Sequence, residues 1–71
     1  MHKHSLLFSD RQSCIEAADW LLEEYGTDME DWDFSYDGLS FTWYTAQALT
    51  ERQKYVIQDT LSPISFLSEE L

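Results

Sequence analysis

The side chains of this chain that could do chemistry are one cysteine, two histidines and fourteen carboxylates. Cys14 lies within an apolar helical pattern without a histidine placed beside it, so we interpret it as a small buried hydrophobic residue rather than a nucleophile. His2 and His4 lie near the N-terminus, and no third ligand follows them at a matching spacing. Neither residue type therefore indicates a nucleophilic or a metal site.

The run Asp33-x-Ser35-x-Asp37-Gly38 has the spacing of the first half of an EF-hand calcium loop. The last position of such a loop should be a bidentate glutamate but is Tyr44, and no helical pattern flanks the run. A β-turn explains the same residues, so we expect no calcium site.

Neighbouring carboxylates, such as Asp31 with Asp33 and Glu23 with Glu24, are the remaining candidates for acid–base chemistry. That chemistry needs one carboxyl in an apolar pocket, which separates the two pKa values. The patterns around these residues place them in solvent instead. We expect a protein that is not an enzyme and has no cofactor and no metal.

The net charge of −10 is the strongest signal in the composition. No lysine or arginine lies between Arg11 and Arg52, whereas ten acids lie there: Glu16, Asp19, Glu23, Glu24, Asp28, Glu30, Asp31, Asp33, Asp37 and Glu51. Such a surface repels nucleic acid and anionic membranes and attracts basic protein surfaces. The simpler alternative is that the charge serves solubility alone.

The length of 71 residues predicts a single domain, 1–71, with a thin core. The one cysteine excludes an internal disulfide, and the sequence has neither a signal-peptide pattern nor an apolar run of roughly 20 residues that would span a bilayer. We therefore expect a cytoplasmic protein with no contact to a membrane.

The segment Asp31–Tyr44, DWDFSYDGLSFTWY, has the pattern of a β-hairpin. Asp37-Gly38 is a preferred dipeptide for a two-residue type I′ turn, because both turn positions need positive φ. Folding about that turn pairs Phe34 with Phe41. One face then carries Trp32, Phe34, Tyr36, Leu39, Phe41 and Trp43, and the other carries Asp31, Asp33, Ser35, Ser40, Thr42 and Tyr44. A slip of one residue would mix the two sets, so the pattern predicts this register.

Residues 10–25 have the pattern of an amphipathic helix. Ser9 and Gln12 have the spacing of a capping box, and Gly26 is expected to end the helix in the left-handed conformation. The expected apolar stripe consists of Cys14, Ile15, Ala17, Ala18, Leu21, Leu22 and Tyr25. The opposite face carries Glu16, Asp19 and Glu23, and Trp20 projects among these acids.

Thr50 and Gln53 form a second capping box, which predicts a helix over Glu51–Leu61. Ser62-Pro63 ends that helix and suggests a short final helix up to Leu71. The run His4–Phe8 is compatible with a strand. The predicted fold is a small two-layer α+β domain of helix, hairpin and helix, with the helices on one face of an antiparallel sheet and the N-terminal strand as a third member.

Three aromatic residues, Trp20, Tyr44 and Tyr55, fall outside the predicted core, and exposed aromatics amid charge are typical interface anchors. The predicted partner-binding residues are Glu16, Asp19, Trp20, Glu23, Asp28, Glu30, Asp31, Asp33 and Tyr44. They suggest an inhibitor or regulator that binds a basic, nucleic-acid-binding protein by imitating phosphate charge, a class typical of phages and prophages by analogy. The alternative is a small structural or regulatory subunit that forms a homodimer or docks through exposed aromatics.

Overall fold

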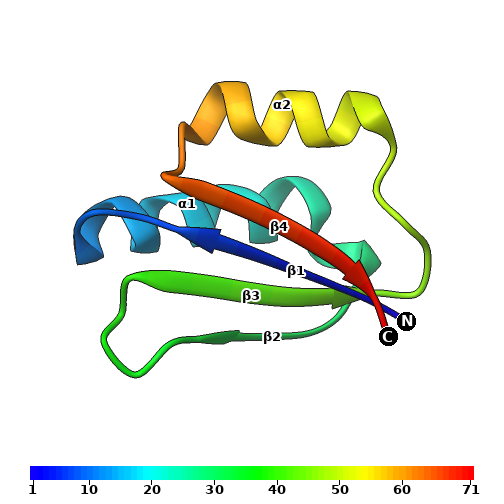
Figure 1. The fold of residues 1–71 in the computed structure, drawn as a ribbon, viewed down its shortest axis with the longest axis horizontal. Helices are drawn as coiled ribbons and strands as arrows, with labels where there is room; N and C mark the ends of the chain where they lie inside the picture. Colours follow the sequence, from blue (N-terminus) through cyan, green and yellow to red (C-terminus); the bar gives the residue numbers. More distant parts are fainter.

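Two helices and a four-stranded antiparallel sheet make up the fold, and the computed structural model describes all residues, 1–71 (Figure 1). In chain order the elements are β1 (His2–Leu7), α1 (Arg11–Tyr25), the short 3₁₀ turn η1 (Gly26–Asp28), β2 (Met29–Phe34), β3 (Ser40–Thr45), α2 (Glu51–Leu61) and β4 (Ser65–Glu70). The α+β class is therefore confirmed. Neither helix has the length and apolar character that crossing a bilayer requires.

The strand order β2-β3-β1-β4 follows from two interlocked β-α-β units. All neighbouring strands are antiparallel, so β1 is parallel to β2 with β3 between them, and β3 is parallel to β4 with β1 between them. Each helix makes the long crossover that a parallel pair needs. This split β-α-β arrangement, also called ferredoxin-like, supports many unrelated functions and does not indicate one by itself.

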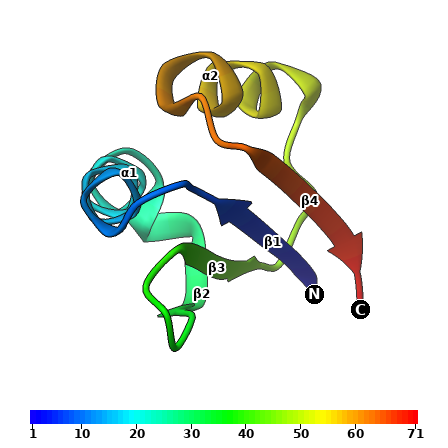
Figure 2. The same ribbon diagram turned by 60° about the vertical axis from the view of Figure 1, so that its left-hand side comes forward.

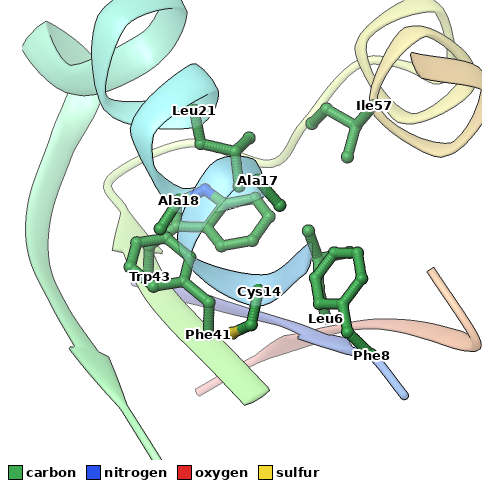
Figure 3. Packing of buried hydrophobic residues seen from close by; sticks show 9 residues of the cluster. All are labelled: Leu6, Phe8, Cys14, Ala17, Ala18, Leu21, Phe41, Trp43 and Ile57. Carbon is green, nitrogen blue, oxygen red and sulfur yellow. The ribbon is translucent and has the colours of Figure 1, made fainter. Parts of the chain in front are cut away.

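One face of the sheet, here called the core face, carries five of the eleven buried residues. It carries His4 and Leu6 of β1 opposite Trp43 and Phe41 of β3, and all four are buried. The core cluster consists of Leu6, Phe8, Cys14, Ala17, Ala18, Leu21, Phe41, Trp43 and Ile57 (Figure 3). The small side chains of α1 lie against the stacked rings of Phe41 and Trp43, whose centroids are 5.8 Å apart. Helix α2 adds Ile57 as its single buried residue.

The predicted hairpin register is confirmed, whereas the predicted turn is wrong. Phe34 pairs with Phe41, and Trp32, Asp33 and Asp31 pair with Trp43, Thr42 and Tyr44. Only Gly38 has positive φ in the connection, at 75°, so the turn is not type I′. A four-residue loop, residues 36–39, replaces it. The side chain of Asp37 stabilises this loop by accepting hydrogen bonds from the Ser35 hydroxyl at 2.6 Å and the Leu39 amide at 3.0 Å.

Both predicted ends of α1 need correction. Asp10, and not Ser9, is the N-cap, because its carboxylate accepts from the Ser13 amide at 2.8 Å and from the Ser13 hydroxyl at 3.0 Å. These bonds lower the pKa of Asp10. Gly26 is not left-handed but helical, with φ −57° and ψ −33°, and the chain continues into η1. The apolar stripe is also narrower than predicted, since Ile15 is 46% exposed.

The prediction for α2 is confirmed in its bounds and in its capping box. The Thr50 hydroxyl accepts from the Gln53 amide at 3.0 Å, and the Gln53 side chain accepts from the Thr50 amide at 2.9 Å. Ser62 follows in the left-handed conformation, with φ 46°.

The predicted C-terminal helix is wrong, because residues 65–70 form β4. They pair along the whole of β1, which is longer at its start than the predicted His4–Phe8 strand. Figures 1 and 2 show β4 beside β1, with the two chain ends together. Pairing with β1 decides that these residues form a strand, and a pattern confined to residues 64–71 gives no information about that pairing.

Candidate functional site

The acids of α1 project away from the core. Glu16, Asp19 and Glu23 are exposed and lie opposite the buried residues Cys14 and Leu21 in the helical periodicity. Glu16 accepts a hydrogen bond from the Gln12 side chain at 3.3 Å, one helical turn away. The last turn of α1 contains no basic residue that would offset its carboxylates. The α1 acids therefore form a solvated anionic surface on one side of the molecule.

Two acids that follow α1, Asp28 and Glu30, line an open hollow of about 420 Å³. Asp28 ends η1, and Glu30 lies at the irregularity where the pairing of β2 with β3 shifts. Both are exposed and line this hollow together with the aromatic rings of Tyr25 and Trp43. The hollow offers two carboxylates and the half-buried ring of Tyr25 to a lysine or arginine side chain, whereas Trp43 is only 1% exposed. Sequence analysis identified the two acids but not the hollow that they line with Tyr25.

Asp31 and Asp33 lie on β2, on the sheet face opposite the core face, here called the outer face. Asp31 is across from Tyr44 and Asp33 is across from Thr42. Each carboxylate also accepts from the next backbone amide, that of Trp32 or Phe34, at 2.8 Å. These acids are exposed, but one oxygen of each is engaged with the edge of the strand.

The predicted acids therefore lie on one continuous stretch of chain, α1–η1–β2, but they face different directions. We divide them into an α1 group (Glu16, Asp19 and Glu23) and a β2 group (Asp28, Glu30, Asp31 and Asp33). The α1 group points away from the core over the helix, whereas Asp31 and Asp33 point away from the core on the outer face of the sheet. A flat surface would contact only one group at a time, and a surface that contacts both must curve around the β2 edge.

None of these acids forms an ion pair within the protein. The chain has two ion pairs, between His2 and Glu70 and between Lys54 and Glu51, each at 3.8 Å. The guanidinium of Arg11 donates from Nε to the backbone carbonyl of Asp37 at 3.1 Å. The charges of the α1 and β2 groups are thus left without a counterion in the fold.

The aromatic residues are arranged differently from the prediction. Trp20 is half-buried, packs on the core and contacts Tyr25 edge to face, with the ring centroids 5.7 Å apart. It is therefore not the exposed ring among the acids that the sequence predicted. Tyr44 is also half-buried, whereas Tyr55 is 70% exposed. Two rings that sequence analysis placed on the apolar face of the hairpin are exposed: Trp32, at 44%, and Tyr36, which is fully exposed. They are exposed because β2 is an edge strand and Tyr36 lies in the loop.

The reactive side chains lie inside the fold. Cys14 is buried as predicted, and burial raises the pKa of its thiol, with a smaller contribution in the same direction from the charge of Asp37. His4 is buried and both its ring nitrogens have hydrogen-bond partners in the protein. No group of three or more histidine, cysteine, aspartate or glutamate side chains is arranged to hold a metal ion.

We find no significant match to this chain among protein-family models, curated proteins or solved structures.

Proposed function

We propose that this chain is a non-enzymatic, acidic protein-binding module that inhibits or regulates a basic, nucleic-acid-binding protein by imitating phosphate charge. One observation carries the proposal: eight exposed carboxylates on α1, η1 and β2 have no lysine or arginine within ion-pair distance. Arginine and lysine side chains that normally hold phosphates can bind carboxylates in the same way. A partner would supply the counterions that the fold lacks.

The directions of the two acid groups favour a partner with a cleft. We take both helices to cover the core face, since Leu21 of α1 and Ile57 of α2 belong to the same buried cluster. The outer face with Asp31 and Asp33 is then free. A basic cleft that normally encloses a nucleic acid could close around the β2 edge and contact both groups, while the hollow beside Asp28 and Glu30 accepts a lysine or arginine side chain.

The second candidate function is a small structural or regulatory subunit that docks through exposed aromatics or forms a homodimer, with acidity serving solubility. The exposure of Trp32, Tyr36 and Tyr55 supports it. The two candidates differ in salt dependence, because a complex driven by charge weakens steeply as ionic strength rises and an aromatic one does not.

The test is affinity capture from cells at about 0.05 M and about 0.5 M NaCl, followed by mass spectrometry and binding of the captured protein to labelled duplex DNA. We expect the captured protein to be basic, to be released by salt, and to lose DNA when the chain is present. Glu16→Gln with Asp19→Asn and Glu23→Gln should lower the association rate and flatten its salt dependence.

A matched control makes the same change in net charge on α2, with Asp59→Lys and Thr60→Lys, which are both exposed. We expect this variant to bind as the parent does. A complex that survives both high salt and removal of the α1 charges would exclude the charge-mimic function. If Trp32→Ala or Tyr55→Ala then abolished the complex, the subunit function would be supported.

A further inference from the structure

The two edges of the sheet differ in how their free backbone groups are satisfied. β2 forms one edge. Its pairing with β3 leaves the amides of Trp32 and Phe34 pointing outward, because Ser35 donates inward to the Ser40 carbonyl and the direction alternates along an antiparallel strand. The carboxylates of Asp31 and Asp33 accept from these outward amides at 2.8 Å. With its acids and the irregularity at Glu30, the β2 edge is protected against another strand.

The β4 edge lacks this protection. Leu71 donates inward to the Met1 carbonyl at 2.9 Å, so by alternation the backbone groups of Phe66, Ser68 and Glu70 point away from β1. No strand lies on that side. The side chains of the same three residues are on the core face, since Phe66 and Ser68 align with Leu6 and His4. Leu67, whose side chain is on the outer face of the same strand, is 67% exposed.

A groove of about 360 Å³ runs between this edge and α2. Its walls are Glu51, Lys54, Tyr55 and Gln58 of α2, and Phe66 and Ser68 of β4. Figure 2 shows α2 above the beginning of β4, and Ile57 is the only buried residue of the helix. An extended chain added to β4 would therefore place alternate side chains in this groove, against the rings of Tyr55 and Phe66.

We propose that β4 and this groove bind an extended basic segment of a partner protein by strand addition. The segment would hydrogen-bond to the outward backbone groups of Phe66, Ser68 and Glu70. It would place an apolar side chain beside Phe66 and a lysine or arginine beside Glu69 and Glu70. The basic character of the segment rests on the proposed function, whereas the position rests on the difference between the two edges.

Charge decides between a partner segment and a second copy of this chain. Glu69 and Glu70 are exposed along the edge, Glu70 lies 3.8 Å from His2, and in the groove Glu51 is paired with Lys54. A second copy with a net charge of −10 would bring further carboxylates to this surface. A basic segment would neutralise them.

The test uses a short synthetic peptide in which lysine alternates with valine and phenylalanine, and a control peptide that has a central proline and cannot pair as a strand. Amide hydrogen exchange of the whole protein is followed by NMR. We expect the alternating peptide to slow exchange at Phe66, Ser68 and Glu70 by about tenfold at a concentration near ten times its Kd. The amides of Trp32 and Phe34 should be unchanged, and the proline peptide should have no effect.

Two pairs of variants locate the binding surface. The double variant Glu69→Gln with Glu70→Gln should bind the alternating peptide severalfold more weakly than the parent. The double variant Glu23→Gln with Glu24→Gln, an equal charge change on α1, should bind the peptide as the parent does. Tyr55→Ala should weaken it, whereas Tyr36→Ala, at an exposed tyrosine of the hairpin loop, should not.

Three outcomes would overturn the inference. If the α1 substitutions weaken binding of the alternating peptide and the β4 substitutions do not, basic segments bind the α1 acids. That result would leave the proposed function standing. The absence of peptide binding at any position would exclude strand addition. Protection of the β4 amides that grows with protein concentration, without peptide, would identify a second copy as the occupant.

Discussion

The buried imidazole of His4 and the hydroxyl of Thr45 form a hydrogen bond whose direction the rest of the structure determines. His4 Nε2 lies 2.8 Å from Thr45 Oγ1, and that hydroxyl donates its proton to the Gln47 carbonyl at 2.6 Å. Thr45 must therefore accept from His4, which places the ring proton on Nε2. His4 Nδ1 then accepts from the Ser68 hydroxyl at 2.8 Å. The neutral ring thus links β1 to the end of β3 and to β4.

This arrangement predicts a loss of stability as the pH falls. Burial lowers the pKa of His4 below its ordinary value of 6.5, and the charges of His2 and Lys54 lower it further. The unfolded chain then binds the proton more tightly than the folded one. The stability from the neutral ring is complete above pH 6.5 and declines as the pH falls below 6.5 toward the folded-state pKa. Urea unfolding at several pH values between about 5 and 7 measures this slope.

The variant His4→Gln separates this effect from that of the carboxylates. It should be less stable than the parent near neutral pH by about 1–3 kcal/mol, because buried hydrogen bonds are lost, and its slope should be shallower. His2→Gln should keep most of the slope. An unchanged slope in His4→Gln would show that the buried ring is not the group that titrates.

The two phenylalanines that face each other across the hairpin should differ in their contribution to stability. Their ring centroids are 5.2 Å apart, but Phe41 is fully buried on a central strand, whereas Phe34 is half-buried on the edge. Phe41→Ala should lower the free energy of unfolding by about 3–5 kcal/mol, and Phe34→Ala by about half of that. Denaturant unfolding of both variants tests the difference. Equal losses would contradict the burial difference between the two strands.

The two glycines should respond to substitution in opposite directions. Gly38 has φ of +75°, and a Cβ there would lie 3.1 Å from Arg11 Nε, so Gly38→Ala should cost roughly 1–2 kcal/mol. Gly26 is helical with open space around it, so Gly26→Ala should gain about 0.4–1 kcal/mol. Thermal unfolding of the pair provides the measurement. If Gly26→Ala lowered stability as much as Gly38→Ala does, the result would indicate that Gly26 has the left-handed conformation that the sequence suggested.

Patterns that are decided over a few residues could be predicted from the sequence. The Thr50–Gln53 capping box is satisfied by two bonds within one turn, and the apolar alternation around Phe34 and Phe41 fixes the hairpin register. The conformation of residues 62–71 could not be predicted in this way. Their spacing of Ile64, Phe66 and Leu67 suits a helix or a strand, and the free side of β1 decides in favour of a strand.

The candidate site divides in the same way. Helical periodicity predicts the exposure of Glu16, Asp19 and Glu23, because it depends on α1 alone. The relation between these acids and Asp31 with Asp33 depends on how α1 crosses the sheet, and a sequence pattern does not contain that information. The half-burial of Trp20 depends equally on tertiary contacts, since it packs on the core cluster.

The unpaired acids predict that salt stabilises the fold. Ten acids lie between Arg11 and Arg52 without an intervening lysine or arginine, and of these only Glu51 is in an ion pair. Their mutual repulsion is screened as the Debye length shortens, so the Tm should be higher at about 0.5 M NaCl than at about 0.02 M. Differential scanning calorimetry at the two salt concentrations measures this. The variant Glu16→Gln with Asp19→Asn and Glu23→Gln should show a higher Tm at low salt and a smaller salt response. A Tm that is flat or falls with salt in the parent would show that the carboxylates are already paired or bound in solution.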